Sequence, residues 1–160
     1  MFYDLEDPKS FVSDIEKCLA DEGIWHFEQS YMPSMLRTNS YDTICHEHLE
    51  FYSLKVVKNL LEGEGLRIID VQMNDINGGS FAVTACKKGA FYKSNTPIIN
   101  WLLNHEQEMG LDTIKPYEEF AKRIDIDATP SFLIFNENEM YRIIGAQSFE
   151  KFEQVLQKFG

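Results

Sequence analysis

The feature that most constrains the fold of this chain is an alternation of helix-like and strand-like segments through its first half. Residues 8–22 carry apolar side chains at helical spacing, and residues 24–28 then have the composition of a short buried strand. Ser53 is placed to cap a second helix over residues 54–61, and residues 66–71 have the composition of another strand. Helices that alternate with strands are typical of α/β folds.

The second half of the chain predicts one antiparallel strand that joins this sheet, then two helices, and finally a separate hairpin and helix. Residues 74–79 carry turn residues, and residues 80–87 predict a strand antiparallel to the one before the turn. Two helices are expected next, over residues 97–109 and 116–124. The last segment predicts a hairpin with strands at residues 131–135 and 140–144, then a Ser148-capped helix with Phe149, Phe152 and Phe159 in its core stripe.

Residues 29–42 are rich in Ser, Asn, Pro and Met and predict a long loop. Long loops inside compact domains are usually functional. Tyr31 lies just beyond the first predicted strand, at the position where α/β sheets commonly bind ligands. We therefore expect Tyr31 to contact substrate, with an ordinary loop position as the alternative.

Charge and cysteine content argue against several classes of function. The formal net charge of -11 disfavours nucleic acid and anionic membranes as partners, because both require basic patches. Cys18, Cys45 and Cys86 form no CxxC pair, so neither a zinc knuckle nor a dithiol redox centre is encoded locally. The acidic N-terminus resembles no secretory signal, and no apolar run approaches the roughly 20 residues of a membrane span. We expect a cytoplasmic protein.

Chemistry is expected at His46-Glu47-His48, where two histidines flank a carboxylate among apolar and aromatic residues. Ionisable groups in such surroundings tend to have shifted pKa values, and imidazole is suited to proton transfer near neutral pH. Two alternatives stay open. The segment is a polar strand end or helix start with satisfied hydrogen bonds, or it supplies two zinc ligands, although no third ligand is evident and no metal is predicted.

Three stretches resemble one known family. The run YDTICHEHLEFYSL at residues 41–54 resembles sugar C-methyltransferases that use S-adenosylmethionine, in which a DxIxHEHxxYxS segment is distinctive. Residues 23–36 resemble the fifth strand of a class I methyltransferase and its following loop, and residues 65–89 resemble the last two strands. The resemblance covers residues 2–124. It implies an α/β fold with part of the Rossmann-like class I methyltransferase sheet, made of the later strands with an antiparallel edge.

The resemblance implies methyl transfer to a carbon alpha to a ketone, in a deoxysugar that is linked to a nucleotide. Such a carbon becomes nucleophilic only after a proton is removed, so the reaction needs a base and a stabiliser for the enolate. The family pattern makes His48 the base, with Glu47 to orient or polarise it and His46 to support both. The family's HGGS is written here as Asn77-Gly78-Gly79-Ser80, and Asn77, Gly78 and Gly79 are expected to bind substrate, because glycine lets the backbone approach closely.

The cofactor implied by the resemblance is S-adenosylmethionine. Class I methyltransferases bind it through a glycine-rich loop after the first strand and an acidic residue after the second, and neither motif is found here. The cofactor-binding residues are therefore unknown, the chain is expected to be an incomplete methyltransferase, and whether it is an enzyme stays open. The partner would be a nucleotide-linked ketosugar. An open sheet edge would also favour self-association or a complementing chain, so a non-catalytic interaction module or a chimeric fragment is the alternative.

The tail resembles a different family. Residues 126–134 and 144–149 resemble the end of a DsbA-type thioredoxin-fold protein, in which a Thr-Pro with a cis peptide precedes a hairpin and a final helix. The resemblance implies two domains, a methyltransferase-like domain at residues 1–124 and a thioredoxin-like tail at residues 125–160. A DsbA-type protein without its CxxC pair is accordingly a further alternative for function.

Overall fold

The computed structural model describes residues 2–45, 48–123, 131–135, 140–144 and 147–159 of the 160-residue chain. The chain divides into two compact units, Met1–Pro116 and Tyr117–Gly160, which are described separately. Helices and strands occur in both units, so the α/β class is confirmed. The domain boundary expected after residue 124 lies outside the described residues and stays a prediction.

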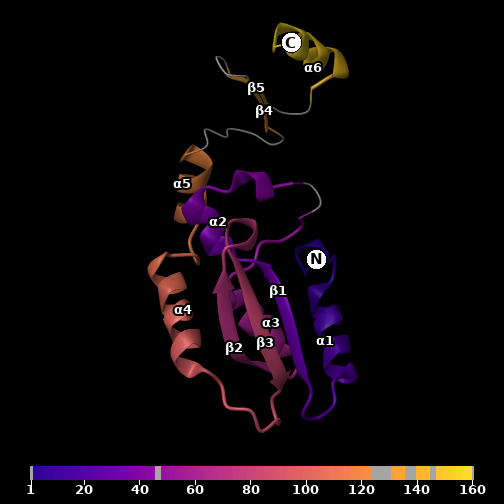
Figure 1. Cartoon of the computed structure of the whole chain (residues 1–160), viewed down its shortest axis with the longest axis vertical. Coiled ribbons are helices and arrows are strands. Elements are labelled where there is room, and N and C mark those ends of the chain that lie inside the picture. The colour runs from indigo at the N-terminus through magenta and orange to yellow at the C-terminus, as the bar shows by residue number, and fades with distance from the viewer. Residues whose placement is uncertain (1, 46–47, 124–130, 136–139, 145–146, 160) are drawn as a thin grey trace. The chain divides into compact units, whose positions relative to one another are not determined.

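The first unit is built on a sheet of three strands (Figure 1), β1 (Ile24–Ser30), β2 (Leu66–Asn74) and β3 (Ser80–Lys87). The strand order is β1-β3-β2, and β3 runs antiparallel to both neighbours. Strands β1 and β2 therefore run in the same direction on either side of a reversed strand. The predicted antiparallel strand at residues 80–87 is confirmed.

Three helices cover one face of this sheet, namely α1 (Pro8–Cys18), α3 (Leu54–Gly63) and α4 (Thr96–Glu108). Figure 1 shows α3 behind the strands, α1 beside β1 and α4 beside β2. Their apolar stripes meet the inward side chains of the strands, which is how amphipathic helices and a half-buried sheet exclude water together. Residues that are no more than 2% exposed in this core include Val12, Leu54, Val57, Leu61, Leu66, Phe81, Val83 and Leu102.

Local capping explains where two of these helices begin. The Asp7 carboxylate accepts a hydrogen bond of 2.9 Å from the Ser10 amide, and Pro8 occupies the first helical position. The Ser53 hydroxyl accepts a bond of 3.4 Å from the Val56 amide at the start of α3. The predicted Ser53 cap is therefore confirmed.

The loop predicted at residues 29–42 is wrong. Strand β1 continues to Ser30, and the chain then forms helix α2 (Met32–Thr38) and the 3-10 turn η2 (Tyr41–Thr43). Five successive residues from Met32 to Leu36 are buried, and α2 ends at Asn39 with a left-handed φ of 59°. A helix of seven residues is too short to be stable alone, so tertiary burial stabilises its conformation.

The second unit contains a hairpin and a helix, as predicted. Strands β4 (Ser131–Phe135) and β5 (Met140–Ile144) pair antiparallel, and α6 (Phe149–Phe159) follows. Helix α5 (Lys115–Arg123) spans the junction between the units. The Phe149 side chain is 77% exposed, so its predicted place in a buried stripe is wrong, whereas Val155 is buried. The Thr-Pro pair at residues 129–130, on which the DsbA-type resemblance partly depends, lies outside the described residues.

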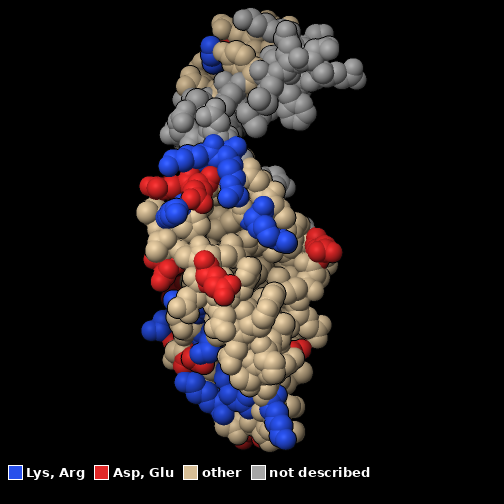
Figure 2. All heavy atoms as spheres, turned by 90° about the vertical axis from the view of Figure 1, so that its left-hand side faces the viewer, with Lys and Arg blue, Asp and Glu red and all other residues tan. Residues whose placement is uncertain are grey.

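The surface of the first unit mixes charges of both signs. On the face that Figure 2 shows, Lys and Arg side chains lie interspersed with Asp and Glu, with broad uncharged areas between them. Among the described helices, none is long and apolar enough to cross a lipid bilayer.

Candidate functional site

Of the three predicted catalytic residues, the structure describes His48, which lies between η2 and α3. Its ring Nδ1 is 2.7 Å from the backbone carbonyl oxygen of Thr43. A carbonyl oxygen can only accept, so Nδ1 carries the proton and donates it. In a neutral imidazole the other nitrogen, Nε2, is then unprotonated and able to accept a proton.

Aromatic rings surround the His48 imidazole. The ring centre of Tyr3 lies 4.3 Å away and that of Phe51 lies 6.2 Å away, and His48 itself is half-buried. A cavity of about 10 Å³ lies beside it, which is room for about one water molecule. We call this space the His48 cavity, and its lining residues are Tyr3, Ser30, Met32, Met35, Thr43, His48, Glu50, Phe51 and Tyr52.

Tyr52 forms one wall of the His48 cavity and is 3% exposed. Its hydroxyl donates to the Glu50 carboxylate. Burial, and then this bond to a carboxylate, raise the pKa of the Tyr52 hydroxyl well above its usual range. Tyr52 therefore stays protonated near neutral pH and cannot itself serve there as a base.

His46 and Glu47 lie outside the described residues. Their predicted roles, support and orientation of His48, stay predictions.

Tyr31, predicted to contact substrate, is buried and has a partner inside the protein. Its hydroxyl donates to the Glu106 carboxylate at 2.8 Å. Burial, and then the neighbouring Glu106 charge, raise the pKa of the Tyr31 hydroxyl far above its usual range. The hydroxyl is therefore a fixed hydrogen-bond donor, and its contact with substrate stays a prediction.

Glu106 is a buried carboxylate that the sequence analysis missed. It comes from α4, is 2% exposed, and also accepts from the backbone amides of Leu54 at 2.6 Å and Lys55 at 2.9 Å. These amides are at the start of α3, where a helix has unpaired N–H groups and favours a negative charge. The signal that could have revealed it is spacing, because Glu106 continues the apolar stripe of Ile99 and Leu102.

Two backbone hydrogen bonds connect the predicted parts of the site through the start of α2. The Tyr31 amide donates to the Gly79 carbonyl at 3.0 Å, and the Met32 amide donates to the Tyr52 carbonyl at 3.0 Å. The β2–β3 turn and the segment after His48 are therefore both attached to the junction between β1 and α2.

Gly78 and Gly79 have left-handed backbone φ angles of 78° and 123°, which glycine adopts without strain. A Cβ atom at Gly78 would lie 2.8 Å from the Ser40 hydroxyl oxygen, and one at Gly79 would lie 2.5 Å from the Ser34 Cβ. The β2–β3 turn packs closely against α2 and against the segment that follows α2. This packing explains why glycine occupies both positions. The Asn77 side chain lies outside the described part of the chain, so substrate contacts at these three positions stay predictions.

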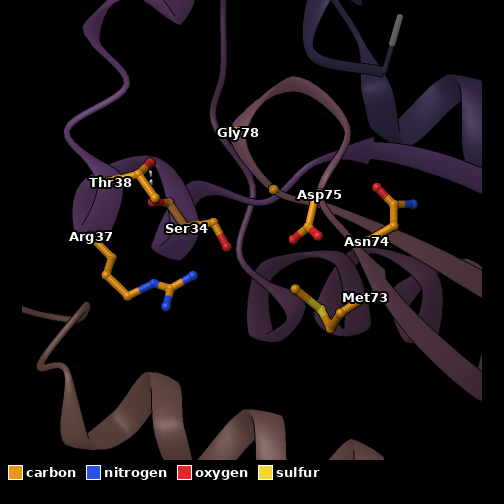
Figure 3. Close-up of a pocket in the computed structure, with 8 residues that line it drawn as sticks. Ser34, Arg37, Thr38, Met73, Asn74, Asp75 and Gly78 are labelled. Carbon is orange, nitrogen blue, oxygen red and sulfur yellow. Dashed lines mark hydrogen bonds between the residues drawn. The ribbon is translucent and has the colours of Figure 1, made fainter.

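Beside these glycines, a cleft of about 410 Å³ lies between α2 and the β2–β3 turn (Figure 3). We call it the Arg37 cleft, and its lining residues are Ser34, Arg37, Thr38, Met73, Asn74, Asp75, Gly78 and Gly79.

The structure does not bring His48 and the glycine pair into one cavity. Met32 and Met35 line the His48 cavity, whereas Ser34 and Arg37 line the Arg37 cleft. Residues two positions apart on a helix point about 200° apart, that is, to nearly opposite sides. The two spaces therefore lie on opposite faces of α2.

Other chemistry has less support among the described residues. They contain no group of three or more His, Cys, Asp or Glu side chains placed to hold a metal ion. Cys18, Cys45 and Cys86 are all free thiols, and Cys86 is buried.

Comparison with known proteins identifies the family. Residues 75–160, more than half of the chain, match the family model described as the C-methyltransferase C-terminal domain. The chain belongs to this C-methyltransferase family. It is also 32% identical over 120 residues to the C-methyltransferase NovU of Streptomyces niveus, an alignment that covers 75% of the chain. The same alignment covers 28% of NovU, so the chain spans little more than a quarter of this relative.

Membership of the C-methyltransferase family confirms the resemblance carried by residues 41–54 and its flanking stretches. The matched range also includes residues 125–160, the tail that resembles a DsbA-type protein. The thioredoxin likeness of that tail stays a prediction.

Proposed function

We propose that this chain supplies the proton-abstracting part of a C-methyltransferase acting alpha to a ketone in a nucleotide-linked deoxysugar. The observation that carries the proposal is the bond from His48 Nδ1–H to the Thr43 carbonyl, which leaves Nε2 as a proton acceptor. Family membership supports methyl transfer as the chemistry, and the resemblance of residues 41–54 to sugar C-methyltransferases supports the sugar substrate.

In the proposed step, His48 Nε2 removes the proton from the carbon beside the ketone. The electron pair of the broken C–H bond moves into the enolate, and the proton stays on the imidazole. The resulting imidazolium is stabilised by the Thr43 carbonyl, because a charged donor strengthens the existing hydrogen bond. The rings of Tyr3 and Phe51 restrict water around the base.

S-adenosylmethionine, when bound, supplies an electrophilic methyl group. The described residues of this chain do not fit it by themselves. The adjacent glycines of this chain, Gly78 and Gly79, pack closely against Ser40 and Ser34. Their backbone is therefore not accessible to the phosphates of a nucleotide. We therefore propose that residues other than this glycine pair hold the cofactor.

The test is solvent deuterium exchange at the carbon alpha to the ketone, which needs the base and no methyl donor. The full chain is mixed with a nucleotide-linked keto-deoxysugar in D2O, and deuterium uptake is followed by NMR. His48→Gln should slow uptake at least about 100-fold, the usual contribution of a general base. His105→Gln is the matched control, since His105 is an exposed residue that stacks on Trp101 in α4.

Two results would contradict the proposal. If the unmodified chain takes up deuterium into the substrate no faster than buffer does, the chain does not act as a base. Equal uptake by the unmodified chain and His48→Gln would assign the proton transfer to another group.

A second candidate function is association through the sheet. Strand β1 pairs only with β3 among the described residues, which leaves its other edge open. Open edges invite pairing with another chain. Light scattering over a concentration series should show a dimer if β1 mediates self-association, and a monomer at all concentrations would rule it out.

A further inference from the structure

We infer that the Arg37 cleft binds a hydroxyl-bearing sugar ring between Arg37 and Asp75, with Ser34 as a third contact. The inference rests on the proposed function and deepens it, because it names ligand-binding residues that the family motif does not point to.

The first argument is that a serine hydroxyl at the wall of the cleft is accessible to a ligand. Ser34 is 7% exposed, lines the cleft, and its hydroxyl makes no hydrogen bond to any described residue. Figure 3 shows its oxygen directed into the space between α2 and the β2–β3 turn. A hydroxyl both donates and accepts, so Ser34 can bond a group that enters the cleft.

The second argument is the arrangement of the two charged groups. Arg37 and Asp75 are exposed, come from the two sides of the cleft, and both point into it (Figure 3). They form no ion pair with each other in the described part of the chain, so each keeps its hydrogen-bonding capacity for a ligand.

The chemistry of these groups selects the ligand class. A guanidinium only donates hydrogen bonds and a carboxylate only accepts them. A hydroxyl satisfies both, because it accepts from Arg37 and donates to Asp75. A phosphate would bind Arg37 but be repelled by Asp75. An ammonium group would bind Asp75 but be repelled by Arg37.

The remaining lining residues set the shape of the cleft. The Thr38 hydroxyl already donates to the Ser34 carbonyl at 2.9 Å, and the Asn74 side-chain oxygen accepts from the Ile76 amide at 3.0 Å. Met73 is 41% exposed and supplies an apolar wall for the C–H face of a ring. The volume of about 410 Å³ lies in the range of small-molecule sites.

The ring has two sources in the proposed substrate, the deoxyhexose and the pentose of the nucleotide carrier. The Arg37 cleft has room for either ring, whereas the His48 cavity on the opposite face of α2 holds about one water molecule. Both rings present hydroxyl groups, which is the chemistry that Arg37 and Asp75 recognise.

The test is a titration of the full 15N-labelled chain, followed through backbone amide signals, with three probes. These are L-rhamnose as a free deoxyhexose, uridine as a nucleoside, and inorganic phosphate, each up to about 100 mM because weak fragments bind in the millimolar range. Saturable shifts of residues 34–38 and 73–79 with L-rhamnose or uridine are expected, and the better probe identifies the source of the ring.

Variants decide whether the charged pair is responsible. Arg37→Gln and Asp75→Asn should each weaken binding of the better probe about tenfold or more, since each removes a charge-assisted hydrogen bond. Lys93→Gln and Asp112→Asn are matched controls, because both residues are exposed and lie outside the cleft lining, and they should bind as the unmodified chain does. The dispersion of the amide spectrum shows in each case whether the variant is folded.

Three outcomes would overturn the inference: no saturable shift with either sugar probe, equal affinity in folded Arg37→Gln and Asp75→Asn, or tighter binding of phosphate than of both sugars. The titration measures binding without chemistry. A successful titration with failed deuterium exchange would contradict the proposed function alone, and the reverse result would contradict the cleft assignment alone.

Discussion

The two faces of α2 differ in what they can do. On one face, His48 lies among aromatic rings beside a cavity of about 10 Å³. On the other, Arg37 and Asp75 line an open cleft of about 410 Å³. An apolar, confined space suits a group that must exchange a proton, and a wide polar one suits recognition of hydroxyls. The comparison shows that one short helix separates the proposed proton abstraction at His48 from the proposed sugar binding in the Arg37 cleft. Four predictions follow this comparison outward from the helix.

The largest effect is expected at Glu106, which binds Tyr31 before α2 and the first amides of α3. Glu106→Ala would leave the Tyr31 hydroxyl and the amides of Leu54 and Lys55 without their acceptor in a buried site. We expect a loss of about 3 kcal/mol or more in the free energy of unfolding, since each unpaired buried group costs about 1–3 kcal/mol. Urea unfolding followed by tryptophan fluorescence measures it.

Glu108→Ala is the control for Glu106→Ala, because Glu108 is an exposed carboxylate on the same helix. It should change the free energy of unfolding by no more than about 0.5 kcal/mol. Equal losses in the two variants would show that Glu106 does not support the site.

The next effect should be confined to the Arg37 cleft. Gly79→Ala combines a φ of 123° with a Cβ placed 2.5 Å from the Ser34 Cβ. We expect a loss of about 2 kcal/mol in unfolding free energy, together with amide shifts around Ser34 that spare the His48 segment. Gly63→Ala is the control, since its Cβ would meet no atom within 4 Å, and it should be neutral within about 1 kcal/mol. If both variants lose the same stability, the turn does not pack on α2 as described.

A third prediction concerns the His48 cavity alone. Long-range 1H–15N correlation at pH 8 should show the neutral His48 ring protonated at Nδ1 and unprotonated at Nε2, because the Thr43 carbonyl can only accept. His26 and His105 serve as internal references in the same spectrum. Protonation at Nε2 would remove the observation on which the proposed base depends.

The smallest effect lies on the sheet, outside both cavities. A hydrogen bond of 2.9 Å from Asn95, followed by one from Gln72, holds the pKa of the Asp70 carboxyl below its usual value. A lowered folded-state pKa stabilises the protein above the unfolded pKa of about 4, and this contribution is lost as the pH falls through the folded value.

Asn95→Ala should therefore reduce the loss of stability between neutral pH and about pH 3, as measured by urea midpoints across that range. Lys93→Ala is a nearby exposed control with no hydrogen bond to Asp70. A pH dependence that is unchanged in Asn95→Ala would mean that the Asp70 pair contributes nothing.

Regular elements with strong local signals could be predicted from the sequence. The strand at residues 80–87 is a short, mostly apolar run between clear turns, and Ser53 caps α3 through its own hydroxyl. Helix α2 was missed because its Pro and Ser, with the Asn and Ser residues that follow, are typical of loops, and a seven-residue helix depends on the burial of Met32 to Leu36.

In the candidate site, too, some features follow from sequence patterns and others only from the tertiary structure. His48 was identified from residue types and the family motif, whereas its protonated nitrogen follows from a carbonyl five residues earlier that only the coordinates place within 2.7 Å. The partners of Glu106 are 75 and 52 residues away in sequence, so no local pattern connects them. Arg37 and Asp75 are ordinary exposed charges until α2 and the β2–β3 turn place them on two sides of one cleft.

The sequence by itself determined the family and most of the strands and helices, and it suggested His48 as the base, because these depend on local composition, short-range spacing and a recognisable motif. The tertiary structure decided that α2 forms, that Glu106 is buried, and that the two candidate spaces lie back to back. The physical reason is that burial and hydrogen-bond partnership depend on residues brought together by packing, and no local window of the chain contains both partners.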